Sequence, residues 1–165
     1  MGKAARRMTK KKQQKIREDT VKSLQEQLRE YFAAENYAEV VNTLALLVQE
    51  KSYDPEDLYK GAYSYFMTGD YPRAINMVNN VLSFAPAHLE ARILLARICM
   101  LQEREQDGLA IFDFILEHYD RKLTAQQRQD IEEILEFYDR TEREQLTAKF
   151  PHIAQFFRKA GGKQS

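Results

Sequence analysis

Apolar residues recur at helical spacing along most of the chain, and their pattern returns every 34 residues. Shifting the sequence by this period aligns Leu44 with Val78 and Phe112, and no gap is needed across three periods. Within each period the helical spacing is interrupted once, near the middle. Because repetition at this length is typical of stacked helical units, the pattern predicts three helical hairpins, at residues 21–54, 55–88 and 89–122.

The middle unit carries the clearest signals for where its helices begin and end. Asp54 and Pro55 suit the N-cap and the first helical position. Gly69 suits the end of the first helix, because glycine adopts the left-handed conformation found there without strain. The first and third units have Glu35 and Glu103 in its place. We therefore expect the hairpins in all three units and the best-defined turn in the middle one.

Residues 123–160 lie outside the repeat register but keep helical spacing. Thr124 and Gln127 have the spacing of a capping box and begin one helix, and a second box at Thr141 begins another. Pro151 is expected to kink or split that last helix. A stacked array leaves its final apolar face bare, which a terminal cap covers. The prediction is an all-α fold of three hairpins closed by two C-terminal capping helices.

Composition narrows the class further. The chain has 165 residues, of which 44% are apolar and 30% charged, and no stretch approaches the length of an apolar membrane span. The N-terminus lacks the apolar segment of a secretory signal. Cys99 is the single cysteine and lies in an apolar helical run, so it is expected to be buried rather than reactive. These features predict a cytoplasmic protein without a disulfide.

Charge is distributed unevenly, although the formal net charge is zero. Eight basic residues precede the first acid, Glu18, and leave an acidic remainder. Residues 1–20 are expected to be a disordered basic arm, and residues 161–165 a disordered tail. The arm either keeps the protein soluble or binds nucleic acid or another anionic surface. The candidate anion-binding residues are Arg6, Arg7, Lys10, Lys11 and Lys12.

The repeat resembles the tetratricopeptide family. The residues of the middle unit that carry the likeness are Leu58, Gly61, Ala62, Tyr65, Gly69, Asp70, Tyr71, Ala74, Leu82 and Pro86. The resemblance implies a right-handed α-α superhelix in which the first helix of each hairpin lines the concave side. It also implies that partner peptides lie on that side. The implied function is therefore a protein–protein interaction module, such as an adaptor, scaffold or chaperone-like protein.

Position in the repeat then gives the expected groove. Its lining residues would be Arg29, Phe32, Tyr59, Tyr63, Phe66, Met67, Ile93, Arg97 and Met100. Aromatic side chains with flanking arginines suit an apolar or amphipathic segment that carries some acidic residues. Alternatives are that these residues only pack the structure, or that the C-terminal segment around Phe150, Ile153, Phe156 and Phe157 fills the groove. A further alternative is a homodimer formed through Phe150–Phe157.

No constellation typical of an enzyme stands out. His88, His118 and His152 are scattered and form no His-x-x-x-His pair of the kind that binds zinc. Adjacent acidic residues lie on helical faces expected to be solvated. The sequence thus predicts a non-enzymatic protein with no cofactor or metal. Its main alternative function is association with nucleic acid or an anionic surface through the basic arm.

Overall fold

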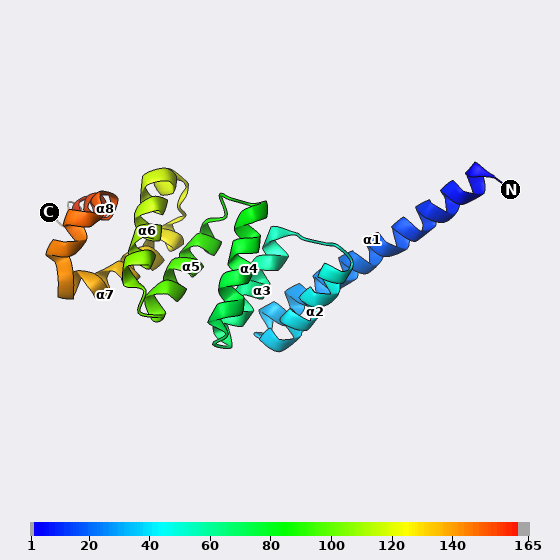
Figure 1. Cartoon of the computed structure of the whole chain (residues 1–165), viewed down its shortest axis with the longest axis horizontal. Coiled ribbons are helices and arrows are strands. Elements are labelled where there is room, and N and C mark those ends of the chain that lie inside the picture. Colours follow the sequence, from blue (N-terminus) through cyan, green and yellow to red (C-terminus); the bar gives the residue numbers. More distant parts are fainter. Residues whose placement is uncertain (1, 162–165) are drawn as a thin grey trace. The chain divides into compact units, whose positions relative to one another are not determined.

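The computed structural model describes residues 2–161, and it describes the side chains of residues 2–136 and 148–159. All regular elements in this part of the chain are helices (Figure 1). They are α1 (Lys3–Ala33), α2 (Tyr37–Gln49), α3 (Pro55–Met67), α4 (Tyr71–Phe84), α5 (Leu89–Leu101), α6 (Glu105–Tyr119), the short 3₁₀ helix η1 (Asp120–Lys122), α7 (Ala125–Lys149) and α8 (Pro151–Gly161). The predicted all-α class, three hairpins followed by two further helices, is confirmed.

The chain forms two compact units, Met1–Phe84 and Ala85–Ser165. In unit 1, α1 packs on α2 and α3, and α3 also packs on α2 and α4. In unit 2, α5 packs on α6 and α7, while α8 packs on α6 and α7. Each unit therefore has its own network of helix contacts.

The same turn joins the two helices of every hairpin. Glu35, Gly69 and Glu103, spaced 34 residues apart, have positive φ angles of 56°, 79° and 59°. In each turn the next backbone N–H donates to a carbonyl five residues earlier at 2.9 Å, as in Asp70 N to Tyr65 O. This is the hydrogen-bond pattern of a Schellman cap, which satisfies carbonyls at a helix end. The glutamates in the first and third units thus adopt the conformation that suits glycine.

Small residues at matching positions allow the helices of a hairpin to pack closely. Ala62, Ala74 and Ala96 have no exposed surface. At Gly108, on α6, an added Cβ would lie 2.9 Å from the Ala96 carbonyl oxygen and 2.7 Å from the Met100 Cγ. The glycine therefore lets α6 approach the backbone of α5.

The prediction that residues 1–20 are disordered is wrong. Helix α1 begins at Lys3 and runs without a break to Ala33, and its N-terminal part continues beyond α2 (Figure 1). Lysine, arginine, glutamine and alanine favour helix, and no proline or glycine interrupts them after Gly2. Once the C-terminal part of α1 is fixed by packing, adding further turns is easier than nucleating a new helix.

The C-terminal boundaries also need correction. Thr124 and Gln127 form the predicted capping box, with N–H···O distances of 3.1 and 3.0 Å. However, α7 continues through Thr141 to Lys149, so no second helix begins there. The break falls before Pro151, which opens α8 because proline suits the first helical position. Of the tail expected at residues 161–165, Gly161 belongs to α8, and residues 162–165 lie outside the described residues.

Helix α8 is held in unit 2 by a cap from another helix. Asp113, on α6, accepts hydrogen bonds from the backbone N–H groups of His152 and Ile153 at 2.9 and 3.0 Å. Its second carboxylate oxygen lies 3.0 Å from the His152 Nδ1. Asp113 thus satisfies N–H groups that the first turn of α8 cannot satisfy internally.

Candidate peptide-binding surface

Six aromatic rings form a connected set in unit 1, which we call the aromatic surface. Its members are Phe32, Tyr37, Tyr59, Tyr63, Phe66 and Tyr71. Tyr63 is central, with ring centroids 5.6 Å from Phe32, 6.1 Å from Phe66 and 6.4 Å from Tyr59. All six side chains are half-buried. The rings therefore support one another and also present apolar area to solvent.

Four helices contribute to this surface because of where their aromatic residues fall. Tyr59, Tyr63 and Phe66 recur at i, i+4 and i+7 on α3, which places them on one helical face. Phe32 lies in the last turn of α1. Tyr37 and Tyr71 open α2 and α4 directly after the two matching turns. The shared hairpin turn thus brings ring-bearing helix ends to the face of α3.

Polar groups border the rings. The Lys60 Nζ lies 5.8 Å from the centroid of the Phe32 ring, within the range of a cation–π contact. Burial raises the pKa of the Tyr37 hydroxyl above its ordinary value, and Glu35 and Tyr63 add to the shift. Tyr37 is therefore neutral at physiological pH and can donate a hydrogen bond to a partner.

A buried carboxylate lies two residues before Tyr59, the first ring-bearing residue of α3. Asp57 is 5% exposed and accepts a hydrogen bond from the Gln25 Nε2 at 2.7 Å. Burial raises the pKa of the Asp57 carboxyl, while this hydrogen bond and the nearby Lys60 and Arg29 act in the opposite direction. The contact joins α1 to α3.

The predicted groove residues of unit 1 remain accessible to different degrees. Phe32, Tyr59, Tyr63 and Phe66 are half-buried, and Arg29 and Met67 are exposed. Arg97, in unit 2, is also half-buried. Within unit 1, the structure thus brings four predicted aromatic residues into one contacting set.

The expectation that Ile93 and Met100 line an open groove is wrong. They are only 6% and 8% exposed, and they belong to the hydrophobic cluster of unit 2. That cluster also contains Leu135 from α7 and both Ile153 and Phe156 from α8. The C-terminal segment enters the core of unit 2, but α8 packs on α6 and α7, and α7 is the C-terminal helix that packs on α5. That the segment around Phe150–Phe157 fills the groove stays a prediction. Its packing removes support for a homodimer through Phe150–Phe157, since Ile153 and Phe156 are buried in their own chain.

Sequence reasoning did not assign Tyr37 and Tyr71 to the site. They stand at the same position of successive repeats, immediately after an asparagine or aspartate N-cap residue. This repetition was the signal that could have identified them. The signal was missed because the resemblance to the family implies partner contacts on the first helix of each hairpin. Tyr37 and Tyr71 instead begin the second helix.

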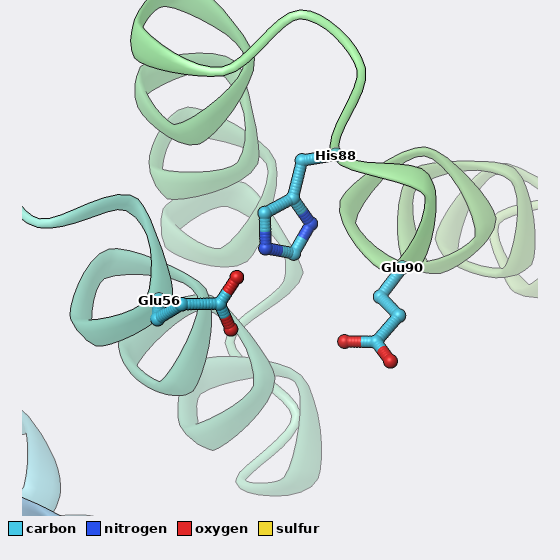
Figure 2. A group of neighbouring side chains, drawn as sticks. All are labelled: Glu56, His88 and Glu90. Atoms are coloured by element: carbon cyan, nitrogen blue, oxygen red, sulfur yellow. The ribbon is translucent and has the colours of Figure 1, made fainter.

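Three polar side chains at helix starts are drawn in Figure 2. The His88 Nδ1 accepts a hydrogen bond from the Ala91 N–H at 3.1 Å and caps α5. Glu90 lies in the first turn of α5, where a carboxylate interacts favourably with the helix dipole. Glu56 has the same place in α3, and its N–H donates to the Asp54 Oδ1 at 2.9 Å. Each helix start is thus stabilised within its own unit.

The hairpins and their shared turn define the protein as a tetratricopeptide-type repeat protein. A family model described as "Anaphase-promoting complex, cyclosome, subunit 3" matches residues 29–115. Because this match covers more than half of the chain, the chain belongs to that family.

One curated relative shows how far the similarity extends. The DnaJ homolog subfamily C member 7 homolog of Dictyostelium discoideum is 29% identical over 76 residues. These residues are 46% of this chain but only 14% of that protein. No solved structure matches the chain. None of the helices within the described residues combines the length and apolar character required to cross a membrane.

Proposed function

We propose that this protein is an interaction module that binds an apolar or amphipathic segment of a partner protein on the aromatic surface of unit 1. The observation that carries the proposal is the connected set of six half-buried rings. Aromatic side chains supply large contact areas at low entropic cost and are enriched among residues that dominate binding energy. Adaptor, scaffold and chaperone-like roles all rest on this one activity.

Charge favours a particular kind of partner segment. Arg29 is exposed, and Lys60 lies over the edge of the surface against Phe32. Acidic residues flanking an apolar core in the partner would pair with these cations. The family description names a subunit of a multiprotein complex, which supports a role in holding other proteins.

The test begins with peptides selected from a displayed random library for binding to the intact protein. The selected peptides are then titrated against the variant Tyr63→Ala/Phe66→Ala, which removes two central rings. We expect their affinity to fall by about tenfold or more, because loss of a binding hot spot costs about 2 kcal/mol or more. Their sequences should combine apolar residues with Asp or Glu.

A matched control removes the same residue types elsewhere in unit 1. Tyr53 and Phe84 are exposed and stack on each other with centroids 5.8 Å apart, as a pair outside the connected set of six rings. The variant Tyr53→Ala/Phe84→Ala should retain the wild-type affinity. Equal affinities of both variants for every selected peptide would refute the proposed site.

A further inference from the structure

The N-terminal half of α1 carries a face on which four of five residues are basic. Residues at alternating spacings of four and three lie along one side of a helix. On α1 these are first Lys3, Arg7, Lys10, Gln14 and Arg17, and then Val21, Leu24 and Leu28. The apolar half of this stripe packs in unit 1, where Leu28 is fully buried. The same stripe becomes basic where the helix continues beyond α2.

The basic half of the stripe contacts α2 at its C-terminal end, at Arg17, and is exposed along its length. The Arg17 guanidinium donates to the Glu50 carbonyl at the end of α2, with its Nε at 3.2 Å. Residues 2–20 are all exposed. Within the described residues, Arg17 is the only cation of this segment with a carboxylate oxygen within 4.0 Å, that of Glu50. Seven further positive charges therefore project into solvent from a helix with a fixed origin.

We propose that this helical arm binds double-stranded DNA through its phosphate backbone. An α-helix with side chains is about 10–12 Å across, which matches the roughly 12 Å width of the B-DNA major groove. The arm from Lys3 to Arg17 spans about 21 Å at 1.5 Å per residue. Its cations can therefore reach phosphates on both sides of the groove, and their binding releases condensed counterions.

Other anionic partners fit the arm less well. A membrane-surface helix requires a continuous apolar face. On this arm Met8 and Ile16 lie on the same helical face, but Lys12 lies between them, so that face is not continuously apolar. A packed protein partner would meet no apolar residue on the stripe before Val21. The arm also lacks aromatic rings on which single-stranded bases could stack. The major groove of duplex RNA is too narrow to admit the helix.

The experiment measures binding of the full chain to a labelled DNA duplex of about 20 base pairs by fluorescence anisotropy, between about 50 and 200 mM salt. Contact with about five phosphates predicts a slope of about −4.5 for log K against log salt concentration. In the variant Lys3→Gln/Arg7→Gln/Lys10→Gln, the slope should fall to about −1.8, because three contacts are lost.

A control variant separates local contact from net charge. Arg121→Gln/Lys149→Gln/Arg158→Gln removes the same number of charges from exposed positions in unit 2 and should keep the wild-type slope. A duplex RNA of the same sequence and phosphatidylserine vesicles serve as competing ligands. The proposal is overturned if DNA does not bind at 50 mM salt, if the two triple variants behave alike, or if RNA or vesicles bind as tightly as DNA.

Discussion

The same face of the repeat is used differently in the two units. Tyr59 and Phe66 on α3 occupy the positions that Ile93 and Met100 occupy on α5, 34 residues later. The first pair is half-buried in unit 1, whereas the second pair is 6% and 8% exposed in unit 2. Repeat position alone therefore does not decide whether a face is available to a partner.

One difference between the units is that two C-terminal helices follow the hairpin of unit 2. In unit 2, α7 and α8 contribute Ile131, Leu135, Ile153 and Phe156 to the cluster that holds Ile93 and Met100. Unit 1 has no such helices, and its own rings partly cover one another. A face covered by the chain uses aliphatic side chains, and the face left accessible uses aromatic ones that tolerate partial exposure.

The largest expected difference is in stability. Ile93→Ala should lower the free energy of unfolding by about 2–5 kcal/mol, because it leaves a cavity in a packed core. Tyr59→Ala, at the matching position of unit 1, should cost only about 1 kcal/mol, near the centre of measured point substitutions. Urea denaturation followed by circular dichroism measures both. Equal losses would contradict the contrast between the two faces.

The next effect concerns the helix that covers unit 2. Asp113→Ala should weaken the docking of α8 by about 1 kcal/mol, the usual cost of losing an N-cap. Hydrogen exchange at the amides of Ile153 and the residues after it should accelerate, while exchange in α2 and α3 stays unchanged. Unaltered protection of α8 would show that the cap does not hold it.

The pH dependence of this docking arises from His152. Its hydrogen bond to Asp113 raises the pKa of the imidazole above its usual value of 6.5. The resulting stabilisation is fully present below pH 6.5 and is lost as pH rises through the folded-state pKa. Protection of α8 should therefore decrease as the solution becomes alkaline, and His152→Ala should remove this dependence. If protection of α8 in the wild-type protein stays constant between pH 5 and 9, the proposed role of His152 in this docking is wrong.

A smaller effect is expected at the shared turns. Glu35→Gly and Glu103→Gly should each raise the free energy of unfolding by about 1 kcal/mol, because a left-handed conformation costs non-glycine residues about this much. Gly69→Ala should lower the free energy of unfolding by a similar amount. Thermal unfolding measures all three. The control Glu26→Gly, inside α1, should destabilise instead. Destabilisation by the first two substitutions would contradict the turn geometry.

The smallest effect is expected at Asp57. Because its pKa is raised by burial, its contribution to stability is highest below the unfolded value of 3.8 and is lost as pH rises through the folded value. Asp57→Asn keeps the shape and should stabilise the protein at pH 7 but not near pH 3.5. Chemical denaturation at both values tests this. An equal gain in stability at both pH values would show that the charge of Asp57 does not cause the difference between the variant and the wild type.

Features that depend on local sequence were predictable. The 34-residue period gave the three hairpins, Asp54 and Pro55 gave the start of α3, and Thr124 with Gln127 gave the start of α7. Burial of Cys99 is also confirmed at 3% exposed. In each case the residues that carry the signal are close together in the chain and act within one or two helical turns.

Features that depend on distant segments were not predictable in the same way. The burial of Ile93 and Met100 depends on a cluster to which α6, α7 and α8 all contribute, and no pattern near these two residues records that. The basic arm posed a different problem. Its residues are both good helix formers and poor core formers, so composition alone could not decide between a helix and a disordered segment.

Thiol labelling at one repeat position tests the contrast between the units most directly. In a Cys99→Ala background, Phe66→Cys and Met100→Cys place a thiol at the matching position of α3 and α5. The former should react with a soluble maleimide about tenfold faster or more, because reaction at a buried site requires local opening. Equal rates, or faster reaction at position 100, would contradict the claim that unit 1 leaves this face accessible and unit 2 covers it.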